Sequence, residues 1–474
     1  MTIAALGGLR LITLKKIFVR IAMLAAAGCI TSAVSACGHS ALAPEPWLTT
    51  APIDGSVGPG GGPTMYAKSP YFEDTTDGFH AIQIFDQDRN NIISVPEAAD
   101  SGNRYGAVWG NRSATAIAWQ TRNAGLSPLL YTPFDTDSPD LGHGLSWWKA
   151  THPDWILYEC DRTTVAYVSG LPEVPLDFAN PAVAAYQSAT LGSYAIANQY
   201  SGLAADIVDM TNNTGNPQRG RGGCGVWKNN HTKWVQRFSG QSTDPLWDAA
   251  LISWAKTLSS ALHHSFATPL ALAVNTSPVS YAGPVNGAGG DPNVRSLFDN
   301  VDIVLDEAGF SIWGNYVGDT GFNNVVHWAE YVQSQSKAFI LADDWNLQKS
   351  VPTTHEVDYS LATYLMGKEQ ASALYIGKND MYGAQNYYHQ YTASIGKACA
   401  PMYGGPNDQK FKGERVYLRV YSGGLSIVNV DQHKQFQVKL PKPQYTNIEG
   451  GTVRSPVTIG PNSGLVLLSP GGCS

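Results

Sequence analysis

Acidic side chains follow a series of short apolar runs along the chain. They are Asp86, Asp135, Asp161, Asp209, Asp306, Glu307, Asp343 and Asp344. In a pair of such carboxylates, one can protonate a poor leaving group while the other stabilises or attacks a positively charged carbon, which is the chemistry of glycoside hydrolysis. Competing chemistries lack their residues, because no HxH pair lies on the first run and no GxSxG motif offers a serine nucleophile. The acids therefore favour a carboxylate-lined cleft.

Tryptophans near the same run ends could stack on the apolar faces of sugar rings. They are Trp147, Trp148, Trp227, Trp234, Trp313 and Trp345. Asn275, which ends another run, could orient a bound sugar. The alternative is that a tryptophan belongs to the core, as we expect for Trp247 and Trp254 at helical spacing. We expect two or three of the loop tryptophans to line the cleft.

Eight apolar runs recur, mostly with room for a helix between them. They cover residues 80–86, 128–135, 154–161, 205–209, 269–275, 301–307, 338–343 and 373–379. Continuous apolar runs are typical of parallel strands buried on both faces. Helical spacing is visible between runs, at 181–200 and 244–264. We therefore predict a (β/α)8 TIM barrel over residues 71–405, with the acids at the C-terminal ends of its strands, where such barrels place their active sites.

The pattern changes after residue 410. Alternating apolar and polar residues, separated by Gly, Asn and Pro turns, replace the long apolar runs. Residues 410–474 are therefore expected to form a small C-terminal antiparallel β-sandwich domain.

The first residues read as a targeting signal. Lys15, Lys16 and Arg20 precede a short apolar stretch, so residues 1–36 are predicted to be a secretory signal peptide. The stretch ends in a lipobox-like Val-Ser-Ala-Cys, which makes Cys37 the expected lipidation site; the alternative is ordinary cleavage after Ala36. Residues 37–70, rich in Gly and Pro, are expected to be a flexible tether. The predicted location is the outer membrane or periplasm of a bacterium.

The remaining cysteines and the net charge limit the partners. Cys160 is predicted to pair with Cys224, and Cys399 with Cys473, in an oxidising compartment. No metal-ligand spacing occurs, so neither a metal nor a cofactor is expected. The formal charge of −7 disfavours a nucleic-acid partner. We expect a monomer that binds carbohydrate and touches a membrane only through its lipid anchor.

Three segments carry a resemblance to a known class of proteins. Asp177-FANPAVAAY, Gly202-LAADIVDMTN and Val301-DIVLDEAGF resemble the corresponding segments of bacterial (β/α)8-barrel glycoside hydrolases, nearest to poorly characterised members and distantly to the α-galactosidase type. The resemblance covers about residues 75–470. It implies a nucleophilic Asp on strand four, matched by Asp209, and an acid/base carboxylate on strand six, matched by Glu307 or Asp306.

Strand alternation and function leave alternatives open. If Asp209 faces the barrel mouth, Asp206 faces the helices and could be a buried structural acid. By the same count, Glu307 is favoured over Asp306. The leading hypothesis is a glycoside hydrolase acting on a polysaccharide or oligosaccharide. The alternatives are a non-catalytic carbohydrate-binding or exopolysaccharide-assembly lipoprotein on the same barrel, and a transglycosylase.

Overall fold

The computed structural model describes eleven stretches of the chain. They are residues 53–54, 83–87, 107–109, 127–134, 143–168, 173–284, 290–345, 352–369, 372–378, 388–471 and 473. These residues form two compact units. The insert unit contains 132–189 and 208–258, and the barrel unit contains 47–131, 190–207 and 259–474. Within the described ranges, no helix is both long and apolar enough to cross a membrane.

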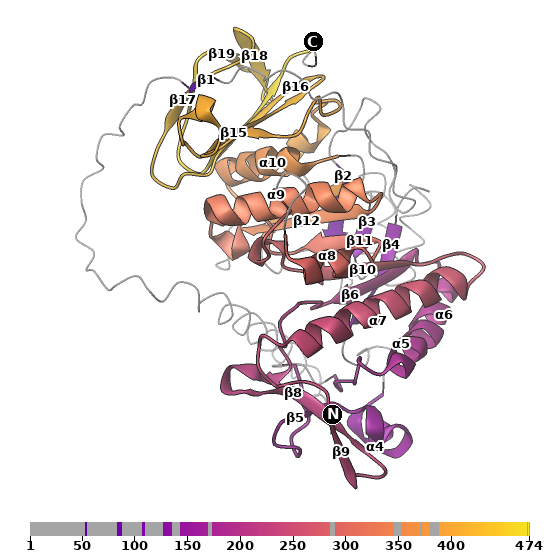
Figure 1. Cartoon of the computed structure of the whole chain (residues 1–474). Coiled ribbons are helices and arrows are strands. Elements are labelled where there is room, and N and C mark those ends of the chain that lie inside the picture. The colour runs from indigo at the N-terminus through magenta and orange to yellow at the C-terminus, as the bar shows by residue number, and fades with distance from the viewer. Residues whose placement is uncertain are drawn as a thin grey trace, which may run out of the picture. The chain divides into compact units, whose positions relative to one another are not determined.

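A closed barrel of parallel strands forms the centre of the barrel unit (Figure 1). In chain order its strands are β2 (Gln83–Gln87), β3 (Ala107–Trp109), β4 (Ser127–Pro133), β6 (Gly202–Asp206), β10 (Ala271–Thr276), β11 (Ile303–Asp306), β12 (Ala338–Trp345) and β13 (Ser372–Lys378). Consecutive strands are neighbours around the barrel, and β13 closes onto β2. The predicted TIM-barrel fold is confirmed.

Alternate residues of these strands fill the barrel interior. Ala204, Ala273, Leu305 and Ala342 belong to one buried cluster, which is made largely of alanine and branched aliphatic side chains. Because side chains alternate along a strand, the residues two positions further on face the mouth of the barrel. Those residues are Asp206, Asn275, Glu307 and Asp344.

One predicted strand is wrong and one was missed. The run 154–161 forms no barrel strand: its only strand, β5 (Tyr158–Glu159), pairs antiparallel with β8 (Arg221–Lys228) in a separate sheet. The run is apolar because Ile156 and Tyr158 belong to the core of the insert unit. The barrel uses β3 instead, which has only three residues and therefore too weak a pattern to detect.

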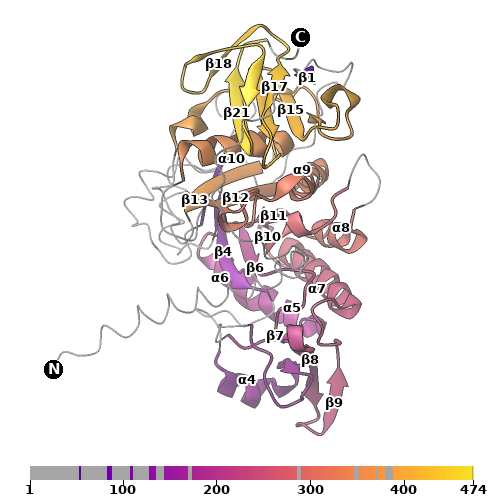
Figure 2. The same ribbon diagram turned by 90° about the vertical axis from the view of Figure 1, so that its left-hand side faces the viewer.

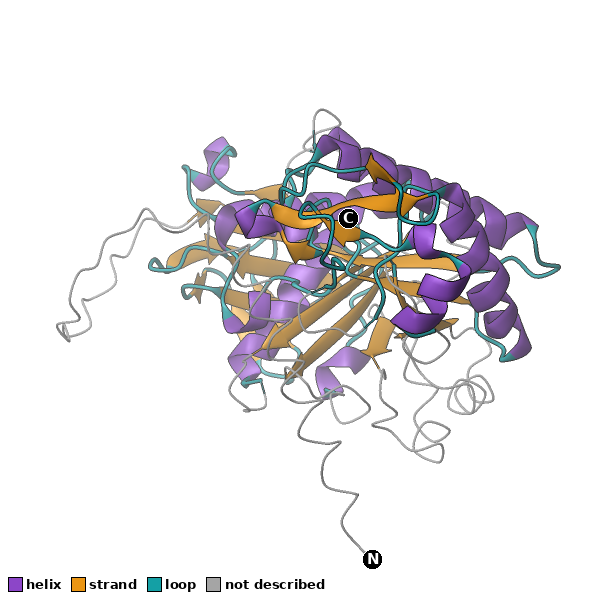
Figure 3. Cartoon of the chain, turned by 90° about the horizontal axis from the view of Figure 1, so that it is seen from below, coloured by secondary structure: helices purple, strands orange, loops and turns teal. Residues whose placement is uncertain are grey.

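Helices and short helical turns alternate with the strands along the chain (purple and orange in Figure 3). The helices and short helical turns are α6 (Ser193–Ala197), α7 (Pro245–His264), η5 (Pro278–Ser280), α8 (Pro292–Phe298), η6 (Ile312–Gly314), α9 (Gly318–Ser334), α10 (Thr354–Gly367), η8 (His389–Thr392) and η9 (Gln409–Phe411). Local sequence sets their starts. The Asp291 side chain accepts the N–H groups of Asn293 and Val294 at the start of α8, and Thr353 forms a capping box with Glu356 at the start of α10.

The insert unit has a small core and sheet of its own. Its elements are α4 (Leu145–Thr151), η2 (Pro153–Trp155), β5, α5 (Pro181–Gln187), η3 (Ser188–Gly192), β7 (Gly215–Asn216), η4 (Pro217–Arg219), β8 and β9 (Lys233–Gln236). The predicted disulfide between Cys160 and Cys224 is present. A second link joins Asp177, which is fully buried, to Arg237 at 2.9 Å.

The C-terminal residues form antiparallel strands, as predicted. They are β14 (Tyr403–Gly404), β15 (Val416–Tyr421), β16 (Gly424–Asn429), β17 (Phe436–Lys439), β18 (Gln444–Asn447), β19 (Thr452–Arg454), β20 (Val457–Ile459) and β21 (Ser463–Leu468). The larger sheet has the order β14-β15-β16-β21-β18-β19. One strand was not predicted: β1 (Ile53–Asp54), inside the expected tether, pairs parallel with β17.

The disulfide between Cys399 and Cys473 is also present. Because Cys399 follows the last barrel strand and Cys473 lies in the C-terminal domain, their positions in the sequence suggest a bond that joins the barrel to that domain. However, the N–H of Cys399 donates to the carbonyl of Val420 in β15, and Cys399 packs on the core of the C-terminal domain. The bond therefore closes the C-terminal domain on itself.

A buried arginine joins the C-terminal sheet to the barrel unit's last helix. Arg419 on β15 is fully buried, and its Nη1 donates to the carbonyls of Leu365, Met366 and Lys368 at the end of α10. Its Nη2 forms an ion pair with Glu369. Figure 2 shows α10 between this sheet and the barrel strands. The last carbonyls of a helix have no hydrogen-bond donor within the helix, so the guanidinium group of Arg419 provides the donors.

Candidate active site

Three polar side chains at the C-terminal ends of neighbouring barrel strands are hydrogen-bonded to one another. Nδ2 of Asn275, on β10, donates to Oδ1 of Asp206 at 2.8 Å and to Oε2 of Glu307 at 2.6 Å. Asp206 ends β6, and Glu307 follows directly after β11. Tyr131 on β4 donates its hydroxyl to Asp206 Oδ2 at 2.9 Å. Strands four to six therefore bring two carboxylates together at the mouth.

The amide of Asn275 fixes the spacing of the two carboxylates. The two hydrogen bonds, of 2.8 and 2.6 Å, share one nitrogen, so Asp206 Oδ1 and Glu307 Oε2 lie at most about 5.4 Å apart. Retaining glycosidases hold their carboxyl groups roughly 5–5.5 Å apart, whereas inverting enzymes need roughly 6.5–9.5 Å to admit a water molecule. The spacing suits direct attack by one carboxylate.

The backbone changes direction immediately after Asp206. Ile207 has φ of +61°, a left-handed conformation that is rare for a β-branched residue. Its N–H donates to Asp206 Oδ1 at 3.0 Å. Such a backbone costs on the order of 1–3 kcal/mol and persists only where the surroundings enforce it. Asp206 is consequently held by three donors, from Tyr131, Asn275 and Ile207.

Two buried acids hold the loop that follows Glu307. Oδ1 of Asp306 accepts the N–H groups of Ala308 at 3.2 Å and Gly309 at 3.1 Å. Asp343 on β12 accepts the N–H of Phe310 at 2.6 Å. Gly309 has φ of +53°, and a Cβ there would overlap Oδ1 of Asp343. Asp306 and Asp343 are both fully buried. They therefore shape the loop and are not placed to act on a substrate, contrary to the roles predicted for them.

Asp343 is expected to make stability depend on pH. Burial raises its pKa to about 6, although the hydrogen bonds from Ser360 and Phe310 act in the opposite direction. The folded protein holds this proton more tightly than the unfolded chain, whose value is near 3.8. The contribution is therefore fully present below about pH 4 and is lost as the pH rises through about 6, with a total of about 3 kcal/mol.

The Asp343→Asn variant tests this. Denaturant unfolding of wild type and variant at several pH values gives a difference in unfolding free energy, from which other titrating groups cancel. The wild type should lose about 3 kcal/mol relative to the variant between pH 4 and pH 7. A difference that stays constant over this range would contradict the prediction.

Asp209, the predicted strand-four acid, does not end the strand. It lies three residues beyond β6, in the insert unit, where its carbonyl accepts the indole N–H of Trp247 at 3.1 Å. The position expected for it belongs to Asp206, which sequence analysis assigned to the helix side. Two features of the sequence could have indicated the position of Asp206. Asp206 is the first acid in an apolar strand, and Tyr131 shares a strand face with the buried Leu129.

The other predicted binding residues lie in different surroundings. Trp345 is 1% exposed, and its indole N–H donates to Ser360 at 2.7 Å in α10. Trp148 is fully buried in the insert core. Both are core residues, so the prediction that they stack on sugars is wrong. Asp344 has the mouth-facing position on β12 and is 1% exposed. Asn275 bridges the two carboxylates instead of standing apart from them.

Asp161 lies in the insert unit and not at a barrel strand end. Its carboxylate accepts the N–H groups of Thr163 and Thr164, and Arg221 contacts it at 2.6 Å. The hydrogen bonds from Thr164 and Thr163 hold the pKa of Asp161 well below its usual range. The same Nη2 of Arg221 contacts Glu159 at 3.0 Å. Asp161 therefore holds the turn at residues 161–164 and positions the side chain of Arg221.

Partly exposed aromatic residues cluster in the insert unit. Trp147 stacks on His143 with ring centroids 3.7 Å apart, and Trp227 faces Trp234 across β8 and β9 at 5.5 Å. Trp147, Trp227 and Trp234 pack against the core that contains Trp148, and His143 contacts Trp148 itself. The predictions for Cys37, for residues 1–36 and for Asp135 fall outside the described residues, as do the side chains of Asp86 and Trp313.

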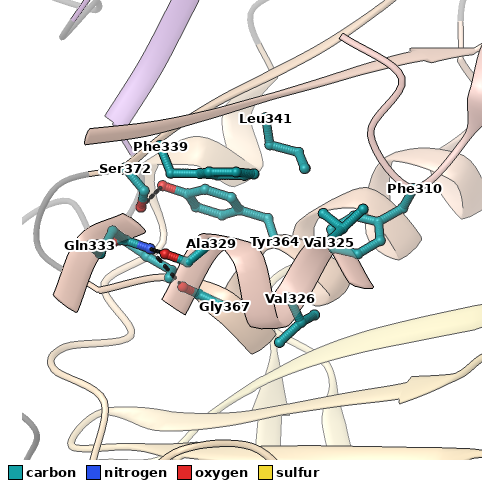
Figure 4. Close-up of a pocket in the computed structure, with 11 residues that line it drawn as sticks. Phe310, Val325, Val326, Ala329, Gln333, Phe339, Leu341, Tyr364, Gly367 and Ser372 are labelled. Atoms are coloured by element: carbon teal, nitrogen blue, oxygen red, sulfur yellow. Dashed lines mark hydrogen bonds between the residues drawn. The ribbon is translucent and has the colours of Figure 1, made fainter. Parts of the chain in front are cut away.

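A small cavity beside β12 is no alternative site (Figure 4). It has a volume of about 10 Å³ and is lined largely by Phe310, Val325, Phe339 and Leu341. Such a space is at the lower limit for one water molecule and cannot hold a sugar. In the part of the chain that the structure describes, no group of three or more His, Cys, Asp or Glu side chains is placed to hold a metal ion.

No protein-family model and no curated protein matches the chain. Solved structures that are similar to it include three glycoside hydrolases. A maltogenic α-amylase from Thermotoga neapolitana has 10% identity and a TM-score of 0.43, with 82% of this chain and 98% of that chain covered. A GH36 α-galactosidase from Geobacillus stearothermophilus has 11% identity and a TM-score of 0.45, with 82% of this chain and 55% of that chain covered. A GH31 sulfoquinovosidase from E. rectale has 11% identity and a TM-score of 0.46, with 86% of this chain and 63% of that chain covered. Likeness at this level assigns no residue and no substrate to the chain.

Proposed function

We propose that this protein is a glycoside hydrolase whose catalytic pair is Asp206 and Glu307. The observation that carries the proposal is the Asn275 bridge, which holds the two carboxylates within about 5.4 Å at the mouth of a closed barrel. The spacing favours retention of configuration at the anomeric carbon. The pair replaces the one inferred from the sequence, since it keeps the strand-six acid and exchanges Asp209 for Asp206.

The surroundings of the two acids support a separate role for each. Asp206 is 4% exposed and is oriented by three donors, which suits a nucleophile that must keep one position. Glu307 is partly exposed, so its carboxyl group can reach a leaving group and solvent. In the first step Asp206 attacks the anomeric carbon and forms an ester, while Glu307 gives its proton to the departing glycosidic oxygen. In the second step Glu307 takes a proton from water, whose oxygen displaces Asp206.

A Glu307→Ala variant tests the acid/base role. The rate on natural, unactivated linkages should fall by about 10³-fold, because the leaving oxygen no longer receives a proton. Bond cleavage in 2,4-dinitrophenyl glycosides needs no protonation and should be spared. Added azide should restore turnover and give a glycosyl azide of retained configuration, measured by NMR.

A matched control is Glu414→Gln, which changes a glutamate of the C-terminal domain paired with Lys434. It should leave all of these rates unchanged. Equal losses on activated and unactivated substrates in Glu307→Ala would remove Glu307 from the acid/base role. Absence of turnover in the wild type on any glycoside would instead favour a non-catalytic carbohydrate-binding protein.

We also propose a cellular location for the protein. Both disulfides fit an oxidising compartment. We place the enzyme outside the inner membrane of a bacterium, held by a lipid on Cys37, as a monomer acting on a polysaccharide or oligosaccharide. The basic and apolar residues before Cys37 support the anchor. Globomycin treatment, which blocks lipoprotein processing, should cause an unprocessed precursor to accumulate.

A further inference from the structure

A groove of about 370 Å³ lies between α9 and the first strands of the C-terminal sheet. One wall is a face of α9 that includes Asp319, Asn323 and His327. The other wall includes Met402 and Tyr403. The groove shares no residue with the candidate active site, and its volume falls within the range of sites that bind small molecules.

A chain of hydrogen bonds forms a rigid floor. Nδ2 of Asn323 donates to the hydroxyl of Tyr417 at 2.7 Å, and that hydroxyl donates to Oδ1 of Asp319 at 2.6 Å. Tyr417, on β15, is 4% exposed. The second hydrogen of Asn323 Nδ2 goes to the carbonyl of Asp319 at 2.8 Å. The polar groups are therefore oriented before any ligand arrives, which lowers the entropic cost of binding.

The floor leaves acceptors for hydroxyl groups. Among the described residues, Oδ2 of Asp319 and Oδ1 of Asn323 accept no hydrogen bond from the protein. His327 lies one further turn along the same face, with Nδ1 directed to Glu330 at 3.3 Å. Residues four apart on a helix are neighbours at roughly 5–6 Å. The groove thus presents a row of polar groups along α9.

The opposite wall of the groove and the charges of its lining residues indicate which class of ligand the groove would bind. Met402 and Tyr403, both partly exposed, offer apolar and aromatic surface. The residues that line the groove include a carboxylate and no lysine or arginine. A phosphate or uronate would be repelled. A ring with hydroxyls at its edge and an apolar face matches both walls.

We propose that this groove is a non-catalytic binding site for a neutral saccharide. It would hold a polymer on the surface of the protein, apart from the site where bonds are cleaved. The inference does not depend on the proposed hydrolysis, because it uses none of the catalytic side chains.

Affinity electrophoresis of the full chain tests the proposal. The Asp206→Asn form is run through native gels that contain amylopectin, glucomannan, galactan or xyloglucan, and through gels with polygalacturonate or alginate. Asn407→Leu, at an exposed position that lines the groove, adds aliphatic bulk with no ring for stacking and no hydrogen-bonding group, and among the described residues it removes no side-chain hydrogen bond. Tyr403→Ala removes the aromatic surface. Tyr331→Ala is the control, because this tyrosine of α9 contacts Asp299 and Arg295 instead of the groove.

At least one neutral polymer should retard the protein, with binding about tenfold weaker in Asn407→Leu and Tyr403→Ala, and unchanged in Tyr331→Ala. In the otherwise wild-type chain, both groove variants should keep the wild-type rate on small glycosides. Retardation by no neutral polymer, by acidic polymers alone, or to the same extent in Asn407→Leu would overturn the proposal. Far-UV circular dichroism shows whether each variant is folded, and Asn407→Leu decides the outcome if Tyr403→Ala is not.

Discussion

Asp206→Asn is expected to lower kcat/KM by on the order of 10⁴-fold or more in the proposed mechanism. An amide cannot attack the anomeric carbon, so the glycosyl-enzyme ester does not form. Asn retains the shape of Asp, and its oxygen can still accept the hydrogen bonds of Asn275 and Ile207. Substrate binding should therefore persist. The measurement is steady-state kinetics together with calorimetry on the same oligosaccharide.

The matched control is Asp209→Asn. Asp209 lies three residues beyond β6 and outside the bridge that Asn275 forms, and the substitution leaves in place the backbone carbonyl that accepts the indole N–H of Trp247. Its activity should stay near that of the wild type. The reverse result, with Asp209→Asn inactive and Asp206→Asn active, would return the nucleophile to the residue that the family resemblance indicated.

Arg419→Met is expected to lower the free energy of unfolding by about 3–5 kcal/mol. The substitution removes the donors that satisfy three carbonyls at the end of α10, and it leaves the carboxylate of Glu369 buried without its cation. Burial already raises the pKa of Glu369 in the presence of Arg419. Urea unfolding followed by circular dichroism gives the value.

Arg415→Met is the control, since Arg415 precedes the same strand and is exposed. It should change stability by less than about 0.5 kcal/mol. The double variant Arg419→Met with Glu369→Leu should regain part of the loss, because no unpaired charge stays buried. A loss in Arg419→Met no larger than in Arg415→Met would show that the buried arginine contributes nothing net.

The barrel could be predicted because most of its strands are continuous apolar runs. β10, β11, β12 and β13 are apolar over nearly their whole length, and each is buried on both faces. β3, with three residues, offers no such pattern. The run 154–161 looked similar because a small separate core also buries apolar side chains. Apolar content reports burial, and it does not report which sheet a segment joins.

The sequence indicated an acid at the ends of strands four and six, but it pointed to Asp209 where the structure has Asp206 at the end of β6. Alternation was counted backward from Asp209, which assumed that the strand continued to that point. The left-handed Ile207 ends the regular backbone at Asp206. The residue types at this point of the sequence do not predict a left-handed backbone, because the surrounding fold imposes it. Glu307 was identified correctly as mouth-facing because β11 stays regular up to Asp306.

The order of the two units along the chain has a consequence for biosynthesis. Residues 190–207, with β6, separate the two halves of the insert unit, and the bond between Cys160 and Cys224 spans 64 residues around them. As the chain emerges from its N-terminus, Cys224 becomes reachable only after the whole of β6 has appeared. Oxidation then encloses the strand that carries Asp206 in a covalent loop and removes about 4 kcal/mol of chain entropy from the unfolded state. In an oxidising compartment this disulfide would therefore form late, after the strand that carries Asp206 has been synthesised.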